Sequence, residues 1–169
     1  GEFTVNIAYC QGGVPVFGVI YVPVTRTLYY NHPNGGSAYK TIVGEDHEFS
    51  GTLFRKADAL RPAPAPLEEI KVVGSRSHMN PETESYVEEM KKKFDRVEVV
   101  SRGSSLKFCM VAEGSAHVYP RFAPTMEWDT AAGSAIVEAA GLQVINRETG
   151  QPLRYNKENL LNPFFLVTR

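Results

Sequence analysis

Residues 129–141 read DTAAGSAIVEAAG, and this stretch predicts an α-helix that begins at a carboxylate. Small and apolar residues fill the segment, and Gly141 is the kind of residue that commonly ends a helix. LQVIN follows at 142–146 with the apolar pattern of a β-strand. The helix and the strand behind it form the last step of a longer alternation.

Upstream of this helix the chain alternates strands and helices. The sequence predicts a strand in EIKVVGS (69–75), a helix that starts at Asn80-Pro81, a strand in RVEVVS (96–101), a helix within GSSLKFCMVAEG (103–114) and a strand in SAHVYPRF (115–122). Such an order implies a layered α/β domain, in which ligands bind where strand ends meet helix starts.

The first 43 residues have a different pattern. They predict antiparallel strands in FTVNIAYC (3–10) and at 14–23 around the pair Gly12-Gly13, and two further strands around HPNGG (32–36). RPAPAP (61–66) has prolines at alternate positions, which favours an extended connector. We therefore expect antiparallel strands of an N-terminal α+β domain over 1–43, a connector over 44–68 and a C-terminal α/β domain over 69–169.

The composition is that of an ordinary globular protein, with 43% hydrophobic and 22% charged residues. The net charge of -1 and the scattered cations argue against a protein that binds duplex nucleic acid, but they allow a site for one small anion. Cys10 and Cys109 lie in apolar runs and indicate no disulfide framework, so a cytoplasmic location is expected. No segment has the length of a membrane span.

Three junctions between strands and helices carry unusual side chains: GSRSH (74–78), GSSLK (103–107) and WDTAAG (128–133). Each alone is most simply a loop with a helix cap. If they converge, hydroxyls, helix N-termini, Lys107, Arg76 and His78 would form a phosphate site beside the Asp129 carboxylate. A carboxylate next to phosphate-binding groups is explained by a divalent cation between them, with Mg²⁺ the expected metal.

The segment from Gly103 to Val144 resembles the C-terminal half of the CysQ-type 3'(2'),5'-bisphosphate nucleotidases, a branch of the lithium-sensitive, Mg²⁺-dependent inositol monophosphatase superfamily. GEFTVNIA, SRSH and LNPFFLV agree with the same branch, so the resemblance spans nearly the whole chain. It implies a layered α+β sandwich of the inositol monophosphatase-like phosphatase fold. The C-terminal α/β domain would follow the last antiparallel strands of the N-terminal sheet.

The resemblance also implies roles for individual residues. Asp129, in the Trp-Asp motif, would bind the second metal and touch the substrate. The small residues Ala131, Ala132 and Gly133 would let the helix approach both closely. The other positions implied to bind substrate are Ser75 and His78 near the nucleoside and its phosphate, and Gly103, Ser104 and Lys107 at the helix start.

Arg121 is the expected substrate selector. At the corresponding position the inositol monophosphatases carry an acid that bonds sugar hydroxyls, whereas a guanidinium suits a second phosphate. The alternatives are that Arg121 is a surface residue at a strand end, and that His78 is a surface His before a helix.

The remaining family ligands are a Glu on an upstream helix and two Asp in an Asp-Pro-(Leu/Ile)-Asp-Gly-Thr motif. In the resembled branch this motif lies shortly before the GEF with which the sequence opens. We therefore expect a fragment that is inactive or nearly so by itself.

The expected activity of the whole protein is Mg²⁺-dependent removal of the 3'-phosphate of adenosine 3',5'-bisphosphate, a product of sulfate assimilation, to give AMP. The alternatives are a phosphatase for inositol or sugar phosphates and a non-catalytic nucleotide-binding module. A homodimer and peripheral association with the inner membrane are left open.

Overall fold

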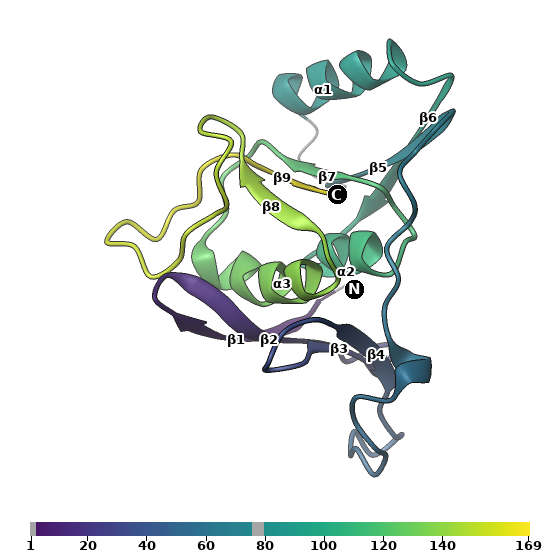
Figure 1. Cartoon of the computed structure of the whole chain (residues 1–169), viewed down its shortest axis with the longest axis vertical. Helices are drawn as coiled ribbons and strands as arrows, with labels where there is room; N and C mark the ends of the chain where they lie inside the picture. The colour runs from purple at the N-terminus through teal and green to yellow at the C-terminus, as the bar shows by residue number, and fades with distance from the viewer. Residues whose placement is uncertain (1–2, 76–79) are drawn as a thin grey trace.

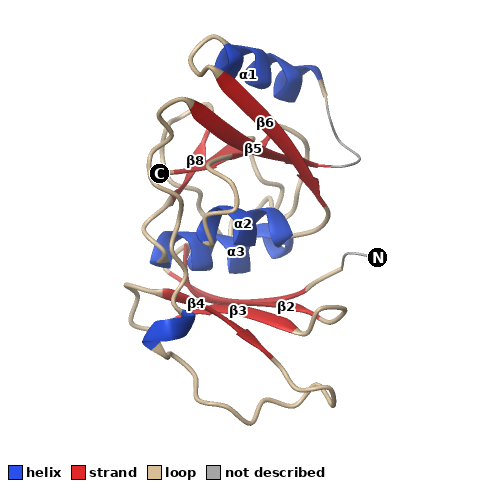
Figure 2. Ribbon diagram, turned by 90° about the vertical axis from the view of Figure 1, so that its right-hand side faces the viewer, coloured by secondary structure: helices blue, strands red, loops and turns tan. Residues whose placement is uncertain are grey.

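The computed structural model describes residues 3–75 and 80–169 of the chain. Its elements form layers, which Figure 2 shows from bottom to top as a sheet, a pair of helices, further strands and a last helix. Figure 1 shows the same order, with β1 to β4 at the bottom and α1 at the top. The expected layered fold of strands and helices is confirmed.

The first sheet is antiparallel, with the strand order β1-β2-β3-β4. It contains β1 (Val5–Gln11), β2 (Val14–Val22), β3 (Thr27–Asn31) and β4 (Ala38–Ile42). Gly12 and Gly13 join the first two strands with φ angles of 59° and 79°. Positive φ at both turn residues suits the twist of a tight hairpin, which explains the two glycines.

Five further strands lie above the helices. They are β5 (Glu69–Ser75), β6 (Arg96–Arg102), β7 (Tyr119–Arg121), β8 (Gln143–Asn146) and β9 (Phe165–Thr168). β5 and β6 are parallel, while β9 pairs antiparallel with β7 on one side and β8 on the other. A parallel bridge from Val72 to Val118 joins the two groups. The upper layer is therefore mixed.

Three α-helices connect these strands, with a short 3-10 helix, η1 (Lys56–Asp58), in the connector. They are α1 (Pro81–Lys91), α2 (Leu106–Ala112) and α3 (Glu127–Ala139). The expected start of α1 is confirmed: Asn80 is the N-cap, its side chain accepts a hydrogen bond from the Thr83 backbone N–H at 3.0 Å, and Pro81 is the first helical residue.

Two predicted elements differ in the structure, and a third element was not predicted. The strand expected over 115–122 is reduced to Tyr119–Arg121. The helix expected from Asp129 begins two residues earlier, at Glu127. β9, the middle strand of its sheet, was not recognised as a strand, because LNPFFLV is a short apolar run beside a proline without clear alternation.

The main hydrophobic core lies between the first sheet and the upper strands. It joins Ile20 and Tyr29 of the first sheet with Phe108 of α2, Ile136 of α3 and Phe165 of β9. Residues on both sides of the connector thus contribute to one core. The division into domains at 44–68 stays a prediction, because shared packing does not say which parts fold by themselves.

Candidate active site

The first two junctions lie next to each other. β5 and β6 run parallel, and Ser75 pairs with Arg102 at their carboxyl ends. The segment 103–105 follows directly and leads into α2. Arg76 and His78 lie outside the described residues, so their expected roles, like that of the Ser75 side chain, stay predictions.

The loop before α2 is bound to the first sheet through hydroxyl groups. The Thr4 hydroxyl lies 2.6 Å from the Ser104 hydroxyl and 2.8 Å from that of Ser105. Ser105 also donates to the Asn6 side-chain oxygen at 2.7 Å. Ser104 has a φ of 52°, the left-handed region that most side chains avoid. The sheet therefore holds this loop in an unusual conformation.

Lys107 is buried in this loop region although it is charged. Its ammonium donates to the Ser104 carbonyl at 2.6 Å and to the Arg102 carbonyl at 3.3 Å. It also lies over the Tyr119 ring, 5.4 Å from the centroid. These partners offset the cost of burying a cation. They give Lys107 a part in shaping the loop, and its expected contact with phosphate stays a prediction.

Asp129 lies in the first turn of α3, near the helix start but not at the N-cap. Met126 occupies the N-cap position. The backbone N–H of Met126 donates a hydrogen bond to the Asp129 Oδ2 at 3.0 Å. Asp129 therefore takes part in capping as the third residue of the helix, and Met126 is the N-cap residue itself. Its side chain is exposed, and its second oxygen has no hydrogen bond among the described residues.

Glu127, which sequence reasoning missed, fixes the start of α3 from inside. Its carboxylate accepts hydrogen bonds from the backbone N–H groups of Asn156 at 2.6 Å and Lys157 at 3.2 Å, and from the Lys157 ammonium. Burial alone would raise the pKa of Glu127, but these hydrogen bonds hold it below its ordinary value. Its position one residue before Trp128 was the available signal, since acids favour the first turn of a helix.

A second network lies on the buried side of the same turn. The Thr130 hydroxyl accepts from the Asn162 side-chain amide at 2.9 Å and from the Tyr155 hydroxyl at 3.3 Å. The Asn162 backbone N–H donates to the Thr125 carbonyl at 2.9 Å. The C-terminal segment thus holds the loop and the first turn that present Asp129. Nothing local in the sequence indicates these long-range partners.

The small residues of TAAG serve packing inside the protein. A Cβ atom added at Gly133 would lie 2.4 Å from the Phe108 ring of α2. On the first sheet, a Cβ atom at Gly18 would lie 2.4 Å from the Ala132 carbonyl. α3 therefore fits closely between α2 and β2. Packing accounts for the small size of Ala132 and Gly133, which are buried, and the expected close approach of this helix to a metal stays a prediction.

Arg121 and Asp129 both act electrostatically on one buried group, the Tyr119 hydroxyl. Burial is the largest cause that raises the pKa of Tyr119, the Arg121 cation lowers it and the Asp129 carboxylate raises it further. Arg121 donates to the Pro124 carbonyl at 2.9 Å. Its Nε atom is buried without a hydrogen-bond partner among the described residues. An unpaired buried donor of a guanidinium suits an anion.

A hollow of about 460 Å³ opens between β1 and the start of α3. Its walls include Asn6, Ala8 and Cys10 from the strand, and Trp128 and Ala131 from the helix. Asn6 also bonds Ser105, so the junction before α2 and the start of α3 meet at β1. Trp128 is 60% exposed here, although large apolar rings are usually covered.

Asp129 is the candidate metal ligand at this site. Asp129 has a free carboxylate oxygen of the kind that Mg²⁺ takes. No group of three His, Cys, Asp or Glu side chains with metal-site geometry occurs in residues 3–75 and 80–169. Asp129 therefore fits a metal only as one member of a set completed by other groups.

The family model described as "Inositol monophosphatase family" matches residues 1–163. The chain belongs to the inositol monophosphatase family. Within this family it is 46% identical over 169 residues to the 3'(2'),5'-bisphosphate nucleotidase CysQ of Salmonella typhimurium and 44% identical to that of Escherichia coli strain K12. In both comparisons 99% of the chain aligns with 61% of the relative, so the chain spans less than two thirds of these proteins.

Solved structures of the family agree with this assignment. The crystal structure of CysQ from Bacteroides thetaiotaomicron is 54% identical, with a TM-score of 0.85, and the match covers 99% of this chain and 63% of the other. Inositol monophosphatase II from Staphylococcus aureus matches 99% of this chain and 58% of its own, at 21% identity and a TM-score of 0.70. The second match shows the fold alone. The expected resemblance to the CysQ-type nucleotidases is confirmed.

Proposed function

We propose that the protein containing this chain is a phosphomonoesterase that removes the 3'-phosphate of adenosine 3',5'-bisphosphate to give AMP. In this hydrolysis water adds to phosphorus, the bond from phosphorus to the 3' oxygen breaks, and that oxygen takes a proton. The names of the relatives support the substrate class, since those at 44% to 46% identity are 3'(2'),5'-bisphosphate nucleotidases. Such a substrate would link the reaction to sulfate assimilation.

The Arg121 Nε, which is buried without a hydrogen-bond partner among the described residues, is the observation that carries the proposal. Arg121 and Asp129 both act on the pKa of the buried Tyr119, and one Asp129 carboxylate oxygen accepts no hydrogen bond from a described residue. The guanidinium would bind the phosphate that is not cleaved, and the carboxylate would hold one of the metal ions, proposed to be Mg²⁺. When bound, the metal would polarise the phosphoryl group and lower the pKa of water.

The loop before α2 has a positioning part in this proposal. Gly103 and Ser104 would face the phosphate, while Lys107 holds the loop through two carbonyls. Ser75 and His78 are proposed to bind the nucleoside side of the substrate. A phosphorylated nucleotide is the proposed partner, and no helix within residues 3–75 and 80–169 is long and apolar enough to cross a membrane. A cytoplasmic location stays a prediction.

The test is a phosphate-release assay on the whole protein that contains these residues. Adenosine 3',5'-bisphosphate should be hydrolysed with Mg²⁺ and not after chelation, and inositol 1-phosphate should be at least tenfold slower by kcat/KM. Arg121→Met should remove most of this preference, because the second phosphate loses its partner. A preference for inositol 1-phosphate would instead establish a sugar phosphate phosphatase.

Asp129→Asn supplies the matched structural control. An Asn oxygen can still accept the Met126 N–H, so the free energy of unfolding should change by no more than about 0.5 kcal/mol. Phosphate release should fall at least 100-fold, because the metal ligand loses its charge. Retention of full activity by this variant would contradict the metal role of Asp129.

A further inference from the structure

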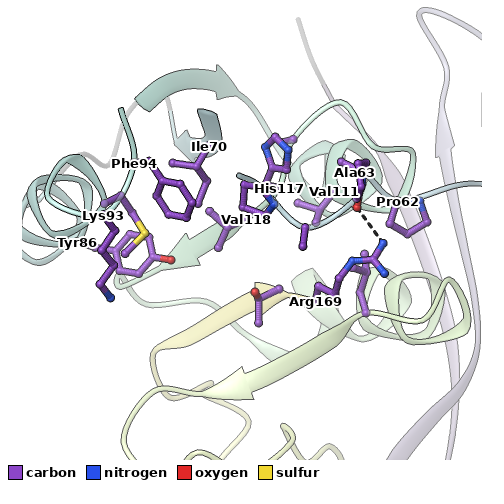
Figure 3. A pocket seen from close by; sticks show the side chains of 17 residues that line it. Pro62, Ala63, Ile70, Tyr86, Lys93, Phe94, Val111, His117, Val118 and Arg169 are labelled. Carbon is purple, nitrogen blue, oxygen red and sulfur yellow. Dashed lines mark hydrogen bonds between the residues drawn. The ribbon is translucent and has the colours of Figure 1, made fainter. Parts of the chain in front are cut away.

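A separate cavity of about 270 Å³ lies between the connector and α1 (Figure 3). The connector residues 62–66 form one wall, and Tyr86, Met90 and Lys93 of the α1 region form another. No lining residue is shared with the hollow beside Trp128, and Asp129 and Arg121 are not among its walls. The cavity is therefore distinct from the candidate active site.

The inner walls of the cavity are apolar and firmly packed. Ile70 of β5, Met90 of α1 and Val118 are all buried and belong to one hydrophobic cluster. The opposite wall is stiffened by the alternating prolines, and Arg169 ties it to β9 through a 2.8 Å hydrogen bond to the Ala63 carbonyl. A cavity between such walls is largely preformed, as ligand sites usually are.

The charged side chains on the cavity walls have one sign. Lys93 and Arg169 line it, and no Asp or Glu is among its lining residues. Figure 3 places these two cations at opposite ends of the apolar walls. Lys93 makes no ion pair within the described part of the chain, whereas its neighbour Lys91 pairs with Glu88 at 2.7 Å. No carboxylate side chain among the lining residues therefore neutralises the Lys93 cation.

Two carboxylates directly precede wall residues in the sequence: Glu69 precedes Ile70, and Glu89 precedes Met90. Glu69 is paired with Arg96 at 2.5 Å. The Glu89 carboxylate raises the pKa of Tyr86, whereas the Arg147 guanidinium lowers it. The guanidinium carbon of Arg147 lies 5.9 Å from the centroid of the Tyr86 ring. His117, a further wall residue, accepts a hydrogen bond from the Lys71 backbone N–H through Nδ1 at 2.9 Å. A neutral His117 ring thus carries its proton on Nε2 and adds a donor.

We propose that this cavity binds a small organic anion that consists of an apolar body, aromatic or branched, and a carboxylate. The apolar body would lie against Met90, Val118 and the Tyr86 ring. The carboxylate would pair with the Lys93 ammonium at the rim. A charge at one end and apolar walls along the rest are what select such a molecule over a polar metabolite of equal size.

The four methionines of the chain, Met79, Met90, Met110 and Met126, provide the readout. Protein labelled with ¹³C at the methionine methyl groups is titrated with 4-phenylbutyrate and followed by NMR. The Met90 signal should shift in a saturable way, while the Met126 signal beside the candidate active site stays in place. The proposal is overturned if the Met126 signal shifts while the Met90 signal does not, or if neither signal shows a saturable shift.

Matched ligands and variants separate charge from apolar contact. 4-Phenylbutylamine has nearly the same size and the opposite charge, and should bind at least fivefold more weakly than 4-phenylbutyrate. Lys93→Met should weaken the binding of 4-phenylbutyrate at least fivefold. The control Lys92→Met, at an exposed residue outside the cavity, should leave the affinity unchanged. Equal affinity for the amine, or an equal effect of the two Lys variants, contradicts the proposal.

A blocking variant tests the position directly. Ala65 is an exposed residue of the connector wall, so Ala65→Trp can fill the cavity without disturbing the core. The free energy of unfolding should be unchanged within error, and the Met90 shift on addition of 4-phenylbutyrate should be lost. A folded Ala65→Trp protein that still binds at Met90 with full affinity overturns the assignment.

Discussion

The ammonium of Lys107 lies 5.4 Å from the centroid of the Tyr119 ring and donates a 2.6 Å hydrogen bond to the Ser104 carbonyl. Lys107 therefore joins the loop before α2 to β7, the strand that ends at Arg121. Two segments that are implied to bind the substrate are fixed to each other by a buried cation. The position of one depends on the other.

Lys107→Met should lower the free energy of unfolding by about 2 kcal/mol, because two carbonyls lose a charged donor while the apolar stem is kept. Urea unfolding followed by circular dichroism measures this. Lys56→Met, at an exposed residue of η1, is the control and should change stability by less than about 0.5 kcal/mol. Equal stability of the two variants would mean that the buried bonds contribute nothing.

Gly133→Ala should destabilise the protein by about 1–3 kcal/mol through overpacking against Phe108. The sign is informative, because the same change in an unhindered helix interior would stabilise it by about 1 kcal/mol. Thermal or urea unfolding gives the value.

A double-mutant cycle identifies the clash behind that value. Phe108→Ala removes Cγ and Cδ2, the ring atoms closest to the added methyl group, so Gly133→Ala should cost less in the Phe108→Ala background than in the unmodified protein. Strictly additive effects would place the strain elsewhere in α3.

Glu127→Gln should destabilise the chain by about 2 kcal/mol at pH 7, because the Lys157 ammonium and the backbone N–H groups lose a charged acceptor. The folded-state pKa of Glu127 is below its unfolded value of about 4.3, so this stabilisation is present above that pH. It is lost as the pH falls through the lower folded value. Urea unfolding from pH 7 to 3 should show the difference between the two proteins shrink.

Glu138→Gln should have the opposite pH dependence. Burial raises the pKa of Glu138 to about 7, so the folded state holds a proton that the unfolded state releases near pH 4.3. The unmodified protein therefore loses stability as the pH rises from about 4 to 7. Glu138→Gln, which stays neutral, should be the more stable protein at pH 8 and equal at pH 4.

The matched control for this comparison is Glu148→Gln, at an exposed residue. Its stability difference from the unmodified protein should stay constant from pH 4 to 8. If Glu138→Gln behaved in the same way, the Glu138 carboxylate would be solvated in the folded protein.

Local signals identified most of the elements. The predicted strand over 69–75 is β5 itself, and Asn80-Pro81 marked the start of α1 because a cap and an N1 proline act within one turn. The start of α3 was placed two residues late, since Met126 has no capping side chain and the helix start depends on Glu127 and its distant partners. β9 was missed because its strand character comes from pairing with β7 and β8.

The sequence showed the residue types of the candidate site, but it did not show the distant residues that hold the first turn of α3 by hydrogen bonds. Asp129 and Arg121 stood out by charge beside a helix start and a strand end. Asn162 and Tyr155, which hold Thr130, are distant in sequence and have no local pattern. Long-range hydrogen bonds leave no periodic signal, so only the folded chain reveals them.

The sequence by itself determined the family, the order of most strands and helices, and the presence of a carboxylate at the start of α3. Periodicity, caps and turn glycines act over a few residues, so they can be recognised without a fold. The tertiary structure alone decided that Ala132 and Gly133 are small to fit β2 and α2, and that Lys107 is buried against Tyr119. Close packing and the burial of charge depend on atoms that only the fold brings together.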